Sequence, residues 1–334
     1  MVYATVLLIQ RRYAMNNCIR KSNLADHMQE YLVLKRMSGF KYNSEGRMME
    51  MFDQYCFDIG FNGDRLNAEL VNGFCYGIHY EKASTRYRKE KLLNGLAEYL
   101  CTIGYPSYIC PRKSTPKKCT YTPYVFSEEE LGNLFKAADT YPPHRLSNRH
   151  LVDSLLFRLI YGCGLRLSEA LNLKLKDVDV IAGTLTILQS KNNKDRKIPM
   201  AESLINRCKK YNREMHLFSN GHTYYFKSPF DRRLDNSAAY RRFREYLWHS
   251  GISHSGHGPR IHDLRHTYCV HCLKRWVLKG KDLTNLFPYL SAYLGHADFR
   301  GTQYYLRLTA DLYPDIISKT EAALGYVIPE GRYP

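Results

Sequence analysis

The feature that most constrains this chain is a basic, proline-bearing segment that separates two long stretches of apolar periodicity. Four prolines recur between positions 105 and 124 among lysines and arginines: Pro106, Pro111, Pro116 and Pro123. Prolines at this spacing interrupt a helix and favour an extended connection. A chain of 334 residues also exceeds the usual span of one hydrophobic core. We therefore predict two domains joined by a basic linker over residues 109–124.

Before this linker the apolar residues recur at helical spacing. Side chains three or four positions apart form two successive apolar faces, Leu24, Met28, Tyr31, Leu32 and then Met48, Met51, Phe52, Tyr55. Two further helices are predicted over about 66–78 and 85–103. We expect an all-helical domain over residues 22–108. An irregular extension over residues 1–21 precedes it, with Met15 a second candidate start.

The charge of the chain favours a polyanionic partner. Lys and Arg total 49 against 32 Asp and Glu, which gives a formal net charge of +17. An excess of this size is typical of proteins that bind nucleic acid, with an anionic membrane surface as the second candidate. The hydrophobic fraction of 44% lies in the range of folded globular chains. The excess charge is therefore expected on a folded surface.

The N-terminal residues and the cysteines together predict a cytoplasmic location. In the N-terminal apolar run the arginines Arg11 and Arg12 follow the run, and no small-residue cleavage site comes after it. This order is wrong for a secretory signal, and the run is shorter than the roughly 20 residues that cross a bilayer. The ten cysteines are therefore expected as reduced thiols rather than as disulfides of a secreted protein.

After the linker the pattern predicts a second, mainly helical domain over residues 125–334 with a small β-hairpin. Ser127 and Glu130 form a capping box ahead of an apolar run, which marks the first turn of a helix. The other predicted elements are helices over about 150–161, 168–173 and beyond residue 238, and strands over 183–189 and 196–200. The turn Lys-Asn-Asn-Lys at 191–194 lies between the strands, so they predict a hairpin.

Seven ionisable side chains of the second domain contain every part needed to cleave a phosphodiester. They are Arg166, Glu169, Lys191, His262, Arg265, His296 and Tyr305. A spacing of three places Arg166 with Glu169, and His262 with Arg265, on one helix face each. Cleavage without a metal ion needs a nucleophile, donors to the non-bridging oxygens and an acid for the departing oxygen. The set includes a tyrosine hydroxyl, two guanidinium groups, and a lysine and histidines that can transfer protons.

Taken singly, each of these residues has an ordinary structural explanation. An arginine three positions from a glutamate is most often an exposed pair worth under about 1 kcal/mol. Lys191 fits a solvated turn, His262 the start of a helix, and His296 a hydrogen-bonded histidine of a core. Tyr305 is one of 28 tyrosines. Only the order and spacing of the whole set distinguish a catalytic site from these alternatives.

Four segments resemble, in order and spacing, the signature motifs of the tyrosine recombinases of the phage integrase family. They are YGCGLRLSEALNLKLKDVD, SKNNKDRKIPM, IHDLRHTYCVH and YLGHADFRGTQYYLRL. The resemblance covers roughly residues 125–320. It implies that residues 125–334 form the catalytic domain with a C-terminal tail. It also implies that the helical domain over 22–108 is a core-binding, DNA-contacting domain, and that the two close on DNA as a C-shaped clamp.

The resemblance assigns a role to each of the seven residues. It makes Arg166 and Arg265 the guanidinium clamp on the scissile phosphate, for which a planar fork of donors is suited. Glu169 supports the clamp. Lys191 would protonate the departing 5′-oxygen. The last three residues are His262, which would help to accept the tyrosine proton, His296, which would donate to a non-bridging oxygen, and Tyr305, which would attack phosphorus.

The same resemblance implies the product, the partners and the cofactors. Attack by Tyr305 would give a 3′-phosphotyrosine and a free 5′-hydroxyl. The covalent bond keeps the phosphodiester energy for rejoining, so neither ATP nor a metal ion is implied. The partner would be double-stranded DNA with a specific recombination site, on which four copies assemble as a synapse, and the place of action the prokaryotic cytoplasm. Integration, transposition and other rearrangements of mobile elements are all compatible with these residues.

Two other functions share this scaffold. A relaxing enzyme similar to type IB topoisomerases would use the same nucleophile and clamp without paired protomers. The chain continues past Tyr305 through Leu308 and Tyr326 to Pro334. This continuation resembles the tail that recombinases pack on a neighbouring protomer. A catalytically silent DNA-binding regulator is expected to lack a clamp or nucleophile residue, and this sequence has all of them.

Three finer predictions concern basic residues, cysteines and the choice of tyrosine. Positive residues expected to contact DNA are Arg86, Arg88, Lys89, Lys113, Lys117 and Lys118. Cys269 and Cys272 have the spacing of a redox or metal pair, but they fall within a predicted helix, so we interpret them as part of a helix face in the core. Of the adjacent tyrosines Tyr304 and Tyr305, the family register favours Tyr305, nine positions after His296.

Overall fold

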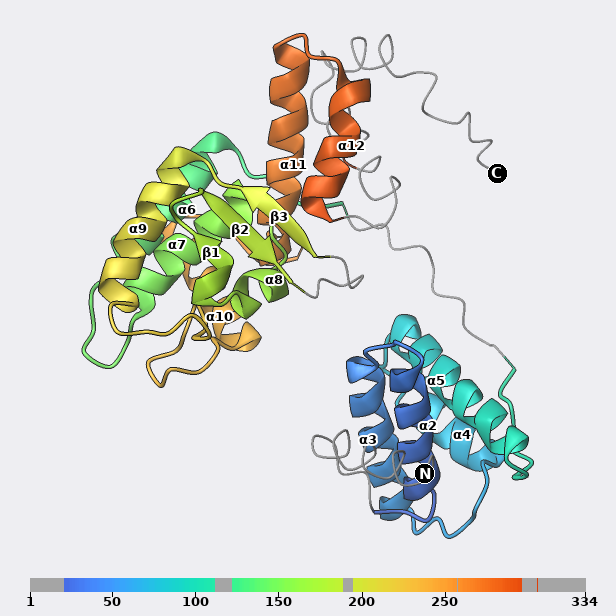
Figure 1. Ribbon diagram of the computed structural model, residues 1–334. Helices are drawn as coiled ribbons and strands as arrows, with labels where there is room; N and C mark the ends of the chain where they lie inside the picture. The colour runs from blue at the N-terminus through green and yellow to red at the C-terminus, as the bar shows by residue number, and fades with distance from the viewer. Residues whose placement is uncertain (1–20, 112–121, 189–194, 257, 296–304, 306–334) are drawn as a thin grey trace, which may run out of the picture. The chain divides into compact units, whose positions relative to one another are not determined.

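The computed structural model describes residues 21–111, 122–188, 195–256, 258–295 and 305, and divides the chain into two compact units (Figure 1). The units are Met1–Tyr121 and Thr122–Pro334. Described residues of both units are mainly helical, and a three-stranded sheet lies in the second. The predicted fold class, mainly α with a small β element, is therefore confirmed.

The first unit is a bundle of helices around an apolar core. Its described helices are α2 (Ala25–Met37), α3 (Asn43–Asp58), α4 (Ala68–Tyr76) and α5 (Ala83–Thr102). Leu32, Phe52 and Leu96 are fully buried members of one cluster to which these helices contribute. The α4 helix begins where the side chain of Asn67 accepts a hydrogen bond from the backbone N–H of Leu70 at 2.8 Å. The helical periodicity of the sequence is thus confirmed in this unit.

The second unit begins with the capping box that the sequence predicts. The backbone N–H of Ser127 donates to the Glu130 carboxylate at 2.8 Å, and that of Glu130 donates to Ser127 Oγ at 3.1 Å. Its helices are α6 (Glu128–Asp139), α7 (Arg149–Gly162), α8 (Leu167–Asn172), the 3-10 helix η2 (Leu175–Asp177), α9 (Glu202–Met215), α10 (Asn236–His249), α11 (Ile261–Leu278) and α12 (Leu283–Leu294).

The sheet of the second unit contains the predicted hairpin and one short additional strand. Strands β2 (Thr184–Ile187) and β3 (Arg196–Pro199) pair antiparallel, and β1 (Val178–Asp179) pairs with β2. Leu185 and Ile187 alternate with half-buried threonines and turn to the core, as the period of a strand requires. Two residues of β1 are too few to show a period, which is why the sequence did not predict that strand.

The elements that carry the predicted motifs surround one end of α11. Helix α11 packs against α7 and α12, and α11 and α12 run side by side (Figure 1). A cluster of buried apolar side chains joins these two helices and includes the ring of Tyr305. Gly295 ends α12 in the left-handed region at φ 66°, which a glycine adopts without steric cost. None of the helices that the structure describes is long and apolar enough to cross a membrane.

Candidate active site

The structure brings four of the seven predicted site residues to one end of α11. Arg166 directly precedes α8, Glu169 lies within it, Arg265 lies in α11, and the ring of Tyr305 packs against α11 and α12. His262 lies on α11 one turn before Arg265 and is exposed. The two remaining residues, Lys191 and His296, lie outside the described residues.

The carboxylate of Glu169 is the centre of the site. Arg166 Nη1 donates to Oε1 at 2.7 Å and Arg196 Nη2 donates to Oε2 at 2.9 Å. Arg265 Nη1 lies 3.8 Å from the same Oε2. Three guanidinium groups from α11, β3 and the residue before α8 therefore meet at one carboxylate.

Hydrogen bonds hold Glu169 ionised. Burial by itself would raise the pKa of this carboxyl, but the hydrogen bond from Arg196 and the backbone N–H of Arg166 outweigh it and lower the pKa to about 2. Its side chain is only 4% exposed. An ionised carboxylate at this depth fixes the direction of the arginines that contact it.

The two predicted clamp arginines differ in their exposure. Arg166 is 20% exposed, and its Nη2 lies 3.4 Å from the backbone oxygen of Gly295. Arg265 is 1% exposed and donates to the backbone oxygens of Gly164 at 2.7 Å and Leu294 at 2.8 Å. Burial, followed by the positive charge of Arg166, lowers the pKa of Arg265. Arg166 is therefore the arginine that an external anion reaches first.

The ring of Tyr305 is buried, with its hydroxyl hydrogen-bonded to His266. Tyr305 is 3% exposed, and its Oη lies 2.9 Å from Nδ1 of His266. Burial, together with the neighbouring Cys269, raises the pKa of the Tyr305 phenol, and Arg265 opposes this only in part. The phenol is therefore neutral at neutral pH, and the predicted role as a nucleophile would require a group that takes the proton.

Two residues of the site were absent from the sequence prediction. Arg196 completes the carboxylate centre and also donates through Nε to the backbone oxygen of Tyr293 at 2.9 Å. It stands two positions from Ile198, on the buried face of β3, and an arginine in that register is a signal of an internal ion pair. His266 stands four positions after His262, hence on the same helix face. This four-residue spacing of the two histidines was the sequence signal that could have pointed to His266.

Gly295, which ends α12, lies against the Arg196 guanidinium that contacts Glu169. A Cβ at this position would lie 2.8 Å from Arg196 Nη1 and 3.0 Å from its Cζ. The chain thus needs glycine here for two reasons, the positive φ and the close approach of the Arg196 guanidinium.

The cysteine pair of α11 belongs to the helix face in the core. Cys269 is fully buried beside Tyr305, and Cys272, one turn later, is half-buried. No group of three or more His, Cys, Asp or Glu side chains is placed to hold a metal ion within the part of the chain that the structure describes. The interpretation of these cysteines as core residues agrees with this burial.

The residues predicted to contact DNA in the first unit have different surroundings. Arg88 is exposed, whereas Arg86 is half-buried and donates to the backbone oxygens of Ile78 and His79. Lys89 is 2% exposed and its ammonium lies 3.0 Å from both Glu81 and the backbone oxygen of Phe74. The prediction for Lys89 is wrong, because its charge is neutralised inside the unit. Lys113, Lys117 and Lys118 lie outside the described residues.

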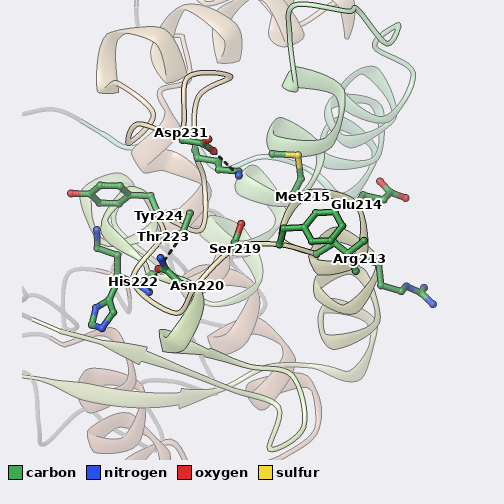
Figure 2. Close-up of a pocket in the computed structure, with 13 residues that line it drawn as sticks. Arg213, Glu214, Met215, Ser219, Asn220, His222, Thr223, Tyr224 and Asp231 are labelled. Carbon is green, nitrogen blue, oxygen red and sulfur yellow. Dashed lines mark hydrogen bonds and ion pairs between the residues drawn. The ribbon is translucent and has the colours of Figure 1, made fainter.

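The second unit also contains a large surface cavity (Figure 2). It measures about 770 Å³ and is bordered by the end of α9 and the loop that follows. Its two lysines have internal partners: Lys227 pairs with Asp231 at 2.6 Å and Lys174 lies over the ring of Tyr224. None of the predicted site residues lines it. The cavity is therefore separate from the group of side chains around Glu169.

Comparisons with known proteins give a common result. A family model described as the phage integrase family matches residues 125–311. The chain is 30% identical over 308 residues to the putative integrase/recombinase y4rB of Sinorhizobium fredii, which covers 90% of this chain and 98% of that protein. It is 31% identical over 202 residues to the tyrosine recombinase XerA of Pyrococcus furiosus, which covers 60% and 62% of the two chains.

Two solved structures share the fold at low identity. A lambda integrase tetramer bound to a Holliday junction matches with a TM-score of 0.60 and 16% identity, covering 84% of this chain and 76% of the other. A lambda integrase dimer bound to a COC′ core site matches with a TM-score of 0.57 and 17% identity, covering 83% and 96%. The fold is thus shared with proteins of very different sequence.

Proposed function

This chain belongs to the phage integrase family and is a tyrosine recombinase, and from this premise we propose that Tyr305 cleaves and rejoins duplex DNA at a specific recombination site. The Tyr305 oxygen attacks the scissile phosphorus, a 3′-phosphotyrosine forms and a 5′-hydroxyl is released. The reverse attack by a 5′-hydroxyl of another strand rejoins the DNA. The family membership supports the reaction, and the geometry supports the residue roles.

One observation carries the assignment of the site: positive charge exceeds negative charge beside the hydroxyl of a buried tyrosine. Among the described residues, three guanidinium groups share the one carboxylate of Glu169, which gives this group of side chains an excess of two positive charges. Buried charge without compensation is costly, so the centre favours an added anion. A phosphodiester supplies one negative charge in the ground state, and more develops on its oxygens during attack.

We assign the two arginines different parts in this step. Arg166, the more exposed of the pair, contacts the non-bridging oxygens first. Arg265 contributes charge from the interior and, through its bonds to Gly164 and Leu294, holds the segments on either side of the site together. Glu169 supports both by fixing their direction. Arg196 belongs to the same centre and is added to the supporting residues.

The remaining roles follow the family resemblance. Lys191 is the proposed acid for the 5′-oxygen, and His296 is a proposed donor to a non-bridging oxygen; both lie outside the described residues. His262 is exposed at the start of α11, and its proposed role is to help bind the scissile phosphate. The unit before the linker is the proposed core-binding domain, with boundaries at 22–108 and 109–124 and with Arg88 at its DNA surface.

The proposed partner is double-stranded DNA bound by several copies of this chain. The lambda integrase structures that share the fold are a dimer on a core site and a tetramer on a Holliday junction. We propose that this chain likewise assembles as a tetramer on paired recombination sites, with its C-terminal tail contacting a neighbouring copy. The proposed place of action is the prokaryotic cytoplasm, because its substrate is duplex DNA.

The experiment that tests this function is the capture of the covalent intermediate. A duplex selected for binding from a random library is nicked a few nucleotides to the 3′ side of the cleavage site. The short fragment that carries the new 5′-hydroxyl then diffuses away, and rejoining fails. The expected result is a DNA adduct on Tyr305, located by digestion and mass spectrometry, that forms in EDTA and without nucleotide. Tyr305→Phe keeps the ring in the core and removes only the hydroxyl, so it should abolish the adduct.

Tyr304→Phe is the matched control, because it makes the same change one position earlier. It should leave the adduct intact. An adduct that persists in Tyr305→Phe and disappears in Tyr304→Phe would show that the register of the last motif is wrong. A strict requirement for Mg²⁺ in cleavage would contradict the proposed chemistry as a whole.

A further inference from the structure

The hydroxyl of Tyr305 contacts a side chain to which the family resemblance assigned no role. Its Oη lies 2.9 Å from Nδ1 of His266, and the two rings are 5.4 Å apart with an angle of 47° between their planes. The hydrogen bond thus joins the proposed attacking atom directly to an imidazole nitrogen. His262, which the sequence favoured as the acceptor of the tyrosine proton, lies one helical turn away.

The imidazole of His266 is held in place by packing. It is half-buried on α11, an 18-residue helix, and lies directly after the fully buried Arg265. The ring of His262 packs edge-on against it, with centroids 4.7 Å apart and an angle of 88° between the planes. A group held in this way is preorganised for its hydrogen bond, since its neighbours limit its rotamers.

The chemistry of the attack requires such an acceptor. A neutral phenol is a weak nucleophile, and its oxygen becomes effective as the proton leaves. Burial beside Cys269 raises the pKa of Tyr305, so the hydroxyl does not ionise by itself near neutral pH. A neutral imidazole within hydrogen-bond distance of the hydroxyl can take the proton, because histidine titrates near the working pH.

We propose that His266 is the general base of strand cleavage. This inference rests on the proposed function, in which Tyr305 is the nucleophile. The phosphorus bond to the Tyr305 oxygen forms and the phosphorus bond to the 5′-oxygen breaks. The phenol proton moves to Nδ1 of His266, and the 5′-oxygen takes a proton from the general acid of the proposed function. On rejoining, the imidazolium returns its proton to the phenol oxygen, so no oxidant, reductant or metal ion is needed.

Two variants separate proton transfer from simple positioning. His266→Ala removes both the hydrogen bond and the base. His266→Asn places an amide oxygen near the position of Nδ1, so it keeps an acceptor for the hydroxyl but has no useful basicity. We expect cleavage of the mapped duplex to be at least about 100-fold slower in both variants, which is the usual contribution of a general base.

A modified duplex distinguishes the base from the acid. Replacing the bridging 5′-oxygen of the scissile phosphate by sulfur gives a leaving group that departs without protonation. Lys191→Ala should be slow on the ordinary duplex and fast on the sulfur duplex. Both His266 variants should stay slow on both, because the nucleophile still has to lose its proton. Removal of a base and removal of an acid therefore give opposite results on one substrate.

Folding and DNA binding are measured on the same proteins. His249→Asn is the control for the loss of a histidine, because His249 is exposed at the end of α10, and its cleavage should equal that of the unchanged protein. The His266 variants should bind the duplex with unchanged affinity in a gel shift. Thermal unfolding of His266→Asn shows whether the Tyr305 cluster stays packed.

Each outcome decides the proposal. Cleavage by His266→Asn at or above the unchanged rate would overturn it, because the contact would then only position or restrain the hydroxyl. Rescue of the His266 variants by the sulfur duplex would also overturn it, since it would make His266 an acid. An adduct that survives Tyr305→Phe would instead contradict the proposed function itself, so the two failures are distinguishable.

Discussion

The second unit contains two buried carboxylates that arginines surround, and they differ in charge balance. Asp153 on α7 is fully buried and contacts Arg149 at 3.2 Å and Arg242 at 3.1 Å. Arg149 also pairs with Glu245 at 2.7 Å, so this cluster holds two positive and two negative charges. The Glu169 centre holds three arginines and one carboxylate.

This difference in charge balance distinguishes an ion cluster that stabilises the fold from a site that can bind an anion. In the Asp153 cluster the hydroxyl of Tyr246 donates to the carboxylate at 3.0 Å, and the rings of Tyr141 and Tyr246 cover the Arg149 guanidinium. The charges of this cluster are therefore balanced within the fold. At the Glu169 centre three guanidinium groups share one carboxylate among the residues that the structure describes, and the tyrosine hydroxyl lies against a histidine. An arginine near a carboxylate thus indicates a functional site only when the charges around both groups do not balance.

The largest expected effect comes from breaking the balanced cluster. Asp153→Ala removes a fully buried carboxylate and leaves the half-buried Arg149 and Arg242 without it, so we expect a loss of about 3 to 5 kcal/mol in the free energy of unfolding. Urea denaturation followed by circular dichroism measures it. Asp153→Asn, which keeps the shape and part of the hydrogen bonding, should lose less. Unchanged stability of both variants would contradict a structural role for this cluster.

Loss of one arginine at the Glu169 centre should affect chemistry rather than stability. We expect Arg166→Ala to cleave DNA about 100- to 1000-fold more slowly, which is the effect of removing one donor to a developing anion. Its affinity in a gel shift should change little, since other cations hold the duplex. Arg242→Ala is the matched change in the balanced cluster, and once folded it should cleave at the normal rate. Near-normal cleavage by Arg166→Ala would count against the site assignment.

The pH dependence of stability should show the ionised state of Glu169. Its pKa is about 2 in the folded protein against an ordinary value of 4.5. A lowered carboxyl pKa stabilises the fold above pH 4.5, and this stabilisation is lost as the pH falls toward 2. The expected contribution at neutral pH is about 3 kcal/mol.

Denaturation of Glu169→Gln and of the unchanged protein between neutral and acidic pH measures this contribution. The gap between their unfolding free energies should narrow as the pH is lowered. Glu214→Gln, on the exposed face of α9, should change the free energy of unfolding only slightly at neutral pH. A gap for Glu169→Gln that is constant with pH would mean that the arginines do not hold this carboxylate ionised.

The smallest expected effect tests the close approach at the end of α12. Gly295→Ala and Gly280→Ala both place a Cβ at a positive φ, 66° and 62°, which costs about 1 kcal/mol in each case. Only the Cβ at Gly295 would meet Arg196, because nothing lies within 4 Å of the position at Gly280. We therefore expect slower cleavage in Gly295→Ala and normal cleavage in Gly280→Ala. Equal cleavage rates in the two variants would show that the Arg196 side chain can move away from the new Cβ without any effect on cleavage.

Local patterns of the sequence predicted the elements of the fold well. The capping box at Ser127, the hairpin between β2 and β3 and the helical periodicity before the linker all depend on residues close together in the chain. The exposure of single residues was predicted less well. Met51 fits the apolar spacing of α3 but is 58% exposed, because the spacing does not say how wide the buried face is.

The sequence by itself determined the fold class, the family and the chemical groups, since these follow from residue types at short and regular spacings. Only the tertiary structure decided which basic side chains remain available to contact an anionic ligand. Lys89 lies in the first half of α5 and Arg166 directly precedes α8. Lys89 is neutralised inside the first unit by Glu81, whereas Arg166 belongs to a group in which three arginines share one described carboxylate. The contact between His266 and Tyr305 joins residues 39 positions apart, and only packing of α11 and α12 around one apolar cluster brings such groups within 2.9 Å.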